Sequence, residues 1–247
     1  MEECMKRKEF LGLNIFEGAL WLSSVTVILS TFLLGGSSDI IVLVASLIGA
    51  TALIYVAKGL PVGQILTVVF ALVYGYISLK FHYYGEMITY LGMTSPIAVA
   101  ATVSWFRNPY EAGRGEVKVR PMRRRDWGVL ILLTAVTTAF FGLILAWLST
   151  PNLFWSTVSV ATSFLASALT LLRSPYYALA YGANDVVLII LWIFASMENS
   201  GYIPMIICFV IFLINDCYGF IHWSKMSREQ RINHKDEKMF EKTETNS

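Results

Sequence analysis

The sequence is poor in charge and lacks the common motifs of energy coupling and catalysis. Only 15% of its 247 residues are charged, whereas about 25% are charged in a typical soluble domain. It contains no Walker lysine motif, no GxGxxG, no HExxH and no CxxC, and no GxSxG. No nucleophile and base can be paired from the sequence either. These absences argue against a soluble enzyme, an ATP-driven pump and an intramembrane enzyme.

Cysteine and histidine are scarce as well. The three cysteines form no motif, and the two that share an apolar segment, Cys208 and Cys217, are nine residues apart, too far for a disulfide within a helix. The three histidines are too widely separated to indicate a metal site. No row of carboxylates runs through the apolar segments, as it would in a proton relay. We therefore expect no cofactor and no metal, and the composition favours a passive carrier.

Eight long apolar segments dominate the chain, which is 56% hydrophobic and has a mean hydropathy of +0.60. Each is about 18–23 residues long, enough to cross a hydrocarbon core of about 30 Å at 1.5 Å per residue. The first could be mistaken for a signal peptide, but Ser37-Ser38-Asp39 is a poor cleavage site, so we expect a retained helix. The pattern predicts an all-α integral membrane protein whose eight transmembrane helices cover residues 14–34, 39–57, 60–79, 87–105, 128–149, 153–172, 175–197 and 202–223.

Positive charge is distributed very unevenly between these segments. All but one of the 19 Lys and Arg residues fall on one side of the predicted membrane, and the exception is Lys80. Basic loops stay cytoplasmic, so both termini should be inside the cell. The basic loop over 107–125 could suggest nucleic acid, but an anchor on anionic lipid headgroups is the better interpretation. We expect the lipid membrane as a partner, and no nucleic acid.

Two stretches, 57–80 and 172–196, resemble each other. Each begins with one cation and then a proline at the start of the next helix, and Pro61 and Pro175 are 114 residues apart. We favour a duplication, in which two three-helix units have the same orientation because a single helix joins them. Substrate would then bind between the units near the midplane. The predicted divisions are an N-terminal segment with an extra helix, a first repeat, a basic loop with a linker helix, a second repeat and a cytoplasmic tail, at 1–38, 39–106, 107–150, 151–223 and 224–247.

Polar residues inside the second predicted repeat are candidates for ligand contact. Asn184, Leu188 and Trp192 are spaced i, i+4, i+8 and share one helix face, so an amide and an indole could bind one ligand. Asn215 and Tyr218 form a similar pair in the last segment. The alternative is that such groups only join helices. Both asparagines are followed by an aspartate, Asp185 or Asp216, which could be a helix–helix acceptor or could be protonated.

The first predicted repeat offers fewer polar candidates. They are Gln64, Tyr74 and Tyr76, while the Thr94-Ser95-Pro96 sequence could open the backbone of its helix. Four tryptophans close to segment ends are interpreted as residues of the interfacial aromatic belt, namely Trp105, Trp127, Trp147 and Trp223.

The segments NDVVLIILW (184–192), FLINDCYGFIHW (212–223) and GYISLKFHYYGEMITYLGM (75–93) resemble the PnuC family of nicotinamide riboside transporters. The resemblance covers roughly residues 40–225. It implies a SWEET-like arrangement of 3 + 1 + 3 helices with one extra N-terminal helix, in a homotrimer of the plasma membrane. It also implies facilitated diffusion of a small vitamin nucleoside, which a cytoplasmic kinase then phosphorylates for NAD synthesis.

The resemblance also carries over residues of the substrate site. It places substrate contacts at Asn184 and Trp192 on the seventh segment and at Asn215 and Tyr218 on the eighth. Nicotinamide riboside carriers often have two tryptophans one turn apart on the seventh helix, whereas Leu188 stands a turn before Trp192 here. Only one indole is therefore available to a pyridinium ring. The expected substrate-binding residues are Asn184, Trp192, Asn215, Tyr218, Leu188, Gln64 and Tyr74.

Two other functions remain open at this point. The missing second tryptophan allows another cargo of the same fold, namely thiamine, a deoxynucleoside or riboflavin. The chain could instead be a membrane substrate-binding subunit that needs an energising partner, with the basic 107–125 loop as its docking surface.

Overall fold

The structure is a computed structural model and describes residues 12–34, 39–80, 83–110, 115–198 and 200–244, with side chains up to 234. Apart from an isolated β-bridge between Pro109 and Val117, the regular secondary structure of this part is helical. The helices are α1 (Ile15–Leu34), α2 (Ile40–Ala57), α3 (Pro61–Lys80), α4 (Tyr84–Thr89), the π-helical turn η1 (Tyr90–Thr94), α5 (Ser95–Phe106), α6 (Arg124–Trp147), α7 (Leu153–Leu171), α8 (Tyr177–Glu198), the 3₁₀ turn η2 (Ser200–Tyr202) and α9 (Ile203–Glu244).

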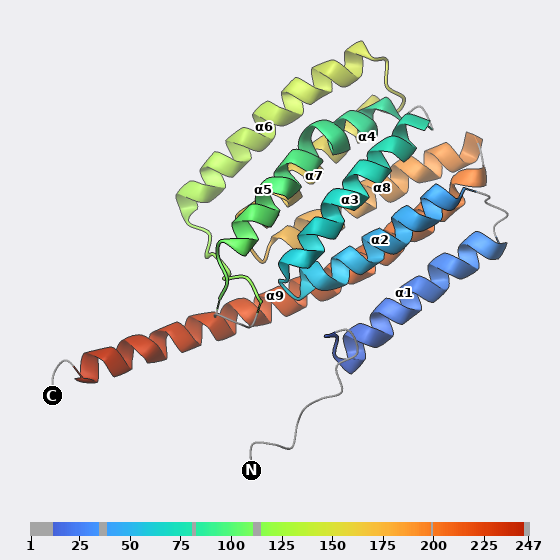
Figure 1. The fold of residues 1–247 in the computed structure, drawn as a ribbon. Helices are drawn as coiled ribbons and strands as arrows, with labels where there is room; N and C mark the ends of the chain where they lie inside the picture. Colours follow the sequence, from blue (N-terminus) through green and yellow to red (C-terminus); the bar gives the residue numbers. More distant parts are fainter. Residues whose placement is uncertain (1–11, 35–38, 81–82, 111–114, 199, 245–247) are drawn as a thin grey trace.

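The prediction of eight membrane segments is confirmed in number. Eight helices of the described part are long and apolar enough to cross a bilayer, and α4, η1 and α5 together form one of them, over Tyr84–Phe106. The last helix differs most from the prediction, because α9 continues without a break beyond the apolar segment to Glu244. In Figure 1 this extension projects past the other helices, at the end of the molecule where α1 begins.

Six of the helices form a closed ring. Around it α2 packs on α3, α3 on α5, α5 on α7, α7 on α8, α8 on α9, and α9 returns to α2. The remaining two long helices lie outside, α1 against α2 and α9, and α6 mainly against α7 (Figure 1). Helix α6 exposes bulky side chains such as Leu143 and Trp147, which are 74% and 83% accessible. Such a helix is suited to face lipid, whereas the ring can enclose an interior site.

The turns α2–α3 and α7–α8 have the same backbone structure. Gly59 and Arg173 both adopt the left-handed conformation, with φ of 71° and 55°. The N–H of each donates to the carbonyl three residues earlier, and the following N–H donates to a carbonyl five residues earlier. Both turns then lead into the segment that begins at Pro61 or Pro175. Left-handed residues at this position end helices by satisfying their last carbonyl groups.

A π-helical turn interrupts the helix that contains Pro96. The N–H of Ser95 donates to the carbonyl of Tyr90, five residues earlier. Proline has no N–H to continue the regular pattern, so a wider turn can be accommodated there. The expectation that Thr94-Ser95-Pro96 opens this backbone is therefore confirmed. Both ends of the turn, Tyr90 and Thr94, are buried.

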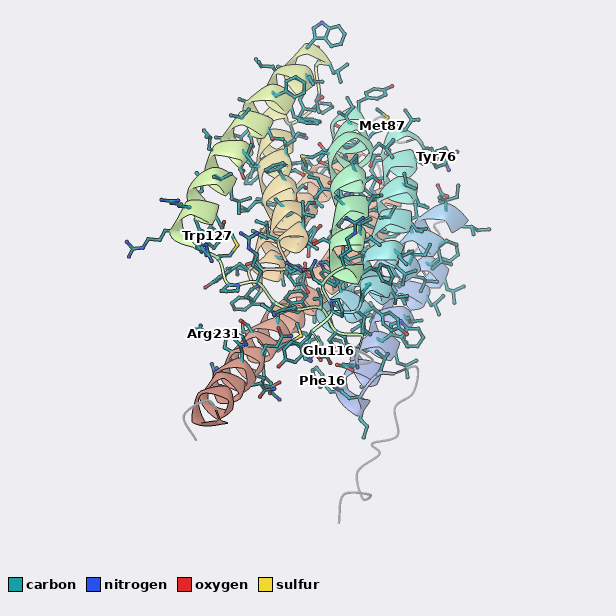
Figure 2. All side chains as sticks on the ribbon, turned by 60° about the vertical axis from the view of Figure 1, so that its left-hand side comes forward. Phe16, Tyr76, Met87, Glu116, Trp127 and Arg231 are labelled. Atoms are coloured by element: carbon teal, nitrogen blue, oxygen red, sulfur yellow. The ribbon has the colours of Figure 1, made fainter. Side chains whose placement is uncertain are left out.

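The loop between α5 and α6 contains an extended segment, residues 116–120, that we call the strap. The N–H of Val117 donates to the carbonyl of Gly59 at 3.0 Å, and the N–H of Arg120 donates to the carbonyl of Arg173 at 3.1 Å. The strap thus joins the two equivalent turns. Gln230 of α9 completes the connection, because it accepts from the N–H of Val119 at 2.8 Å and donates to the carbonyl of Val117 at 3.2 Å. Figure 2 shows Glu116 of the strap at the same end as Phe16 and Arg231, away from Tyr76 and Met87.

Replacing Gln230 by Ala should release the strap from α9. The substitution leaves a buried N–H and a buried carbonyl without their partner, which typically costs about 1–3 kcal/mol of stability. We expect a lower thermal unfolding temperature and faster amide hydrogen exchange at Val117 and Val119. Asn233→Ala is the matched control, since Asn233 is exposed and its amide donates to the Tyr110 hydroxyl at 3.1 Å, away from the backbone of the strap. Unchanged exchange in the Gln230 variant would contradict this role.

Candidate functional site

A cavity of about 60 Å³ lies inside the ring of helices. It has room for a few water molecules, since one needs about 10–15 Å³ by this measure. Its lining comes from α2, α3, the η1 region, α8 and α9: Gly49, Ala52, Leu53, Val56, Gln64, Thr67, Phe70, Ala71, Tyr90, Thr94, Tyr177, Tyr181, Asn184, Asp185, Phe209, Phe212 and Asp216. The site is thus built by helices from both predicted repeats.

Asn184 is held firmly at the wall of this cavity. Its side-chain oxygen accepts hydrogen bonds from Thr162 and Ser163 of α7, both at 2.8 Å, and the residue is 1% exposed. The Tyr90 hydroxyl is also within hydrogen-bonding range of Asn184. Because the oxygen is occupied twice, the amide N–H groups are the atoms available to orient a ligand or Tyr90. The expected position of Asn184 in an interior site agrees with this geometry.

Three other polar atoms of the lining are buried without a hydrogen-bond partner in the described part of the chain. They are Oε1 of Gln64, Oγ1 of Thr94 and Oδ2 of Asp185. Buried polar atoms are nearly always paired with protein, water or ligand, so a concentration of unpaired ones in one cavity indicates a binding site. They are contributed by three different helical segments, which gives the site acceptor atoms on several sides.

The cavity carries acidic but no basic side chains. Asp185 and Asp216 are each 4% exposed, and their carboxyl groups lie close enough to influence each other electrostatically. The lining residues include no Lys, Arg or His. The rest of the lining is aromatic or aliphatic, including Tyr90, Tyr181 and Phe212. Aromatic faces and carboxylates both attract a cation, whereas a buried anion would be left without a compensating charge.

Two tryptophans close the cavity at the strap end. Trp105 Nε1 donates to the carbonyl of Thr170 at 3.0 Å, and Trp223 Nε1 donates to the carbonyl of Val56 at 2.9 Å. The first bond joins α5 to α7 and the second joins α9 to α2, so each indole N–H bonds a helix of the opposite half of the ring. The two rings are 5.3 Å apart, and Trp223 also packs at 4.9 Å against Tyr177 of the cavity wall. Trp105 and Trp223 are fully buried, so their interpretation as interfacial belt residues was wrong. Both tryptophans do lie near the ends of their apolar segments, but these two helix ends pack against each other in the interior of the bundle and not at the lipid interface.

A second aromatic cluster lies at the opposite end of the cavity. Trp192 Nε1 donates to the Tyr74 hydroxyl at 3.1 Å, and its ring lies 5.0 Å from Tyr83 and 5.7 Å from Tyr202. Tyr74 in turn lies 4.4 Å from Tyr90, which lines the cavity. Trp192 and Tyr74 are thus behind the lining residue Tyr90 and do not line the cavity themselves. Leu188 is fully buried in the same hydrophobic core.

The predicted residues of α9 face another direction. Asn215 donates to Ser24 of α1 at 3.3 Å and to the carbonyl of Ile211 at 2.8 Å. The Tyr218 hydroxyl donates to Glu17 of α1 at 2.9 Å. Neither Asn215 nor Tyr218 lines the cavity, so the structure brings Asn184 and Gln64 to the cavity and places Asn215 and Tyr218 against α1.

Several lining residues were not selected from the sequence. Tyr90, Tyr177 and Tyr181 resemble any other membrane tyrosine in the sequence, and Phe212 and Phe209 resemble ordinary core residues. A signal was present for Asp216, which is the neighbour of Asn215. Both ND dipeptides do contribute to the cavity, but through Asn184, Asp185 and Asp216.

Similarity to known proteins agrees with this architecture. The family model described as nicotinamide mononucleotide transporter matches residues 39–225. A nicotinamide riboside transporter PnuC of Neisseria mucosa is 26% identical over 230 residues, which cover 90% of this chain and 85% of that protein. The PnuC of Haemophilus influenzae is 23% identical over 185 residues, covering 74% and 79%. A crystal structure of the vitamin B3 transporter PnuC has the same fold, with a TM-score of 0.79, 24% identity, and coverage of 91% of this chain and 97% of that one.

The family match spans α2 to the membrane part of α9 and leaves α1 outside. It therefore includes every helix of the ring and every residue of the cavity lining. Because this match covers more than half of the sequence, the chain belongs to the nicotinamide mononucleotide transporter family, a family of multi-pass membrane transporters.

Proposed function

We propose that this protein transports nicotinamide riboside across the plasma membrane by facilitated diffusion. The observation that carries the proposal is a central cavity with two carboxyl groups, several aromatic rings and no basic side chain. The nicotinamide ring of the riboside is a pyridinium cation, so it gains from both carboxylates and aromatic faces. Asn184 and Gln64 supply amide groups for the carboxamide or the ribose.

The same charge pattern favours the riboside over the mononucleotide. A phosphate monoester carries about −1.5 to −2 charges at neutral pH. Placing it beside Asp185 and Asp216 would bury like charges together without a basic side chain to balance the phosphate, which is unfavourable. The name of the matching family refers to the mononucleotide, but the charge of the cavity lining favours the dephosphorylated nucleoside.

Alternating access between two halves would move the substrate. We infer a SWEET-like duplication, with 39–106 and 151–223 as the repeats and α6 as the linker. The equal turns at Gly59 and Arg173 support it. The crossed bonds of Trp105 and Trp223 support it as well, because each reaches a carbonyl of the other half.

The strap end would be cytoplasmic, since it carries the basic 107–125 loop and the start of α6. Both termini would then be inside the cell. Phosphorylation of the riboside there would trap it and supply NAD synthesis, and a homotrimer is the proposed assembly.

Thiamine is a second candidate, favoured by Leu188 at the position where a second indole would be expected. Its thiazolium ring is also a cation and would be balanced by the same carboxyl groups. A competition panel of nicotinamide riboside, thiamine, riboflavin and deoxynucleosides distinguishes them, because only the true substrate should compete at low concentration.

Purified protein in liposomes should take up nicotinamide riboside without ATP or an ion gradient. Folded protein that shows no uptake would contradict the proposed function, and would favour a binding subunit that needs a partner.

Replacing Asn184 by Ala should weaken binding by about 1–3 kcal/mol, because it removes the amide group that would contact the ligand. Asn215→Ala is the matched control, since that amide faces Ser24 of α1. Binding is measured by calorimetry on both variants. Equal losses would place Asn215 in the site as well, whereas no loss in either would show that the cavity is not the substrate site.

A further inference from the structure

A second pocket, unrelated to the central cavity, lies between the strap and the extension of α9. It has a volume of about 320 Å³, within the usual range of ligand sites. Its lining residues are Tyr110, Lys118, Val119, Pro121, Ser227, Gln230, Arg231 and His234. None of them lines the central cavity.

The chemistry of this pocket is opposite to that of the cavity. Lys118, Arg231 and His234 supply nitrogen donors, and no Asp or Glu is found among the described residues that line it. Arg presents a planar fork and Lys a compact charge, and both are the usual ligands of phosphate oxygens. Val119, Pro121 and Tyr110 add an apolar and aromatic wall. We propose that this pocket binds the phosphoryl group of an organic phosphate monoester, with the attached ring system against that wall.

The position of the pocket makes it accessible from water. Its α9 residues, Ser227 to His234, follow Trp223 by four to eleven residues, which is roughly 6–16 Å along a helix axis. Figure 2 shows Arg231 on the part of α9 that projects beyond the bundle. On the proposed function this side is the cytoplasm, where the transported nucleoside becomes a phosphate monoester.

Occupancy of the pocket would act on the closed end of the cavity. Lys118 belongs to the strap and Arg231 to α9, so one phosphate would bridge the two elements. Gln230, which also lines the pocket, already bonds Val117 and Val119 of the strap. The strap in turn donates hydrogen bonds to the two equivalent turns, at Gly59 and Arg173. The indoles of Trp223 and Trp105 donate to carbonyls of the same two turns, those of Val56 and Thr170. A bound phosphate therefore stabilises the closed strap end and slows release of substrate on that side.

The test uses the full chain in nanodiscs of neutral lipid, with nicotinamide mononucleotide and inorganic phosphate as soluble probes. Calorimetric binding of the mononucleotide is expected, and Lys118→Gln and Arg231→Gln should each weaken it by about tenfold or more, as loss of a charged hydrogen bond does. Lys225→Gln is the matched control, because it also removes one positive charge, from α9, the helix that carries Arg231, at a residue outside the pocket. A second set of nanodiscs contains phosphatidic acid, whose headgroup is also a phosphate monoester.

Stabilisation by phosphatidic acid that both pocket variants lose, without binding of the soluble probes, would assign the same site to a lipid headgroup. Absence of binding by every probe, or an equal loss in Lys225→Gln, would overturn the proposal. Mononucleotide inside proteoliposomes should also slow uptake of the riboside in the parent protein but not in Lys118→Gln. That last readout rests on the proposed function, whereas the binding measurements do not, so failure of uptake leaves the test of the pocket intact.

Discussion

Replacing both Asp185 and Asp216 by Asn should weaken binding of nicotinamide riboside about 100-fold while leaving its uncharged, reduced form bound almost as before. A carboxylate and a pyridinium ring about 6 Å apart attract each other by roughly 3 kcal/mol at an effective dielectric constant of about 20. Loss of that attraction corresponds to about a 100-fold weaker affinity. The double variant removes every negative charge that the cavity lining can carry, with almost no change of shape.

Comparing the oxidised riboside with its uncharged dihydro form separates the effect of ligand charge from that of ligand shape. The oxidised and the dihydro forms of the riboside differ little in size, so a purely steric defect would weaken both. Glu86→Gln is the matched control, because Glu86 is also a carboxyl buried in the bundle, 4% exposed, but does not line the cavity. Calorimetry with both ligands provides the measurement. Equal losses for the cation and the uncharged form would show that Asp185 and Asp216 do not select charge.

Removing the indole of Trp223 should cost more stability than any other single truncation discussed here. Trp→Ala substitutions in a core cost about 3–5 kcal/mol, and Trp223 is fully buried against Trp105 and Tyr177. Trp223→Phe keeps an aromatic ring but removes the bond to the carbonyl of Val56 and some buried volume, so a smaller loss of about 1–2 kcal/mol is expected from it. Trp105→Phe should cost a similar amount, since its bond to Thr170 is equivalent.

The control for this series is Trp147→Ala, because that side chain is 83% exposed at the end of α6. Its truncation should change the unfolding temperature in detergent very little. Stability of the four variants is compared by thermal unfolding. A larger effect of Trp147→Ala than of Trp223→Ala would refute the assignment of Trp223 to the closed end of the bundle.

Much of the architecture was predictable because the membrane restricts it. Every spanning segment must satisfy its backbone hydrogen bonds internally, so long apolar segments can only be helices, and their number follows from a hydropathy plot. The matching prolines at 61 and 175 likewise predicted equivalent turns, and the turns before them have the same hydrogen bonds, although α3 begins at Pro61 and α8 only at Tyr177, two residues after Pro175. No sequence pattern predicted the strap, because its hydrogen bonds to Gln230 join segments that are more than 100 residues apart in the sequence.

The candidate site was only partly predictable, for a geometric reason. Adjacent residues of an α-helix point about 100° apart, so in an Asn-Asp pair one side chain can face the cavity and the other a neighbouring helix. On α8 both Asn184 and Asp185 reach the cavity, whereas on α9 Asp216 does and Asn215 contacts α1. Which face is interior depends on the packing of α1 outside the ring, and periodicity within one helix carries no information about that.

From the sequence alone, eight segments that are long and apolar enough to cross a membrane can be recognised, as can the uneven distribution of Lys and Arg between them, because length, hydropathy and charge are local properties of each segment. The tertiary structure alone decided which buried groups meet. It brought Asp185 of α8 to Asp216 of α9, and Trp105 of α5 to Trp223 of α9, and so created an acidic cavity closed by crossed indoles. Those contacts depend on how the ring of helices closes, which is a property of the whole assembly and not of any one segment.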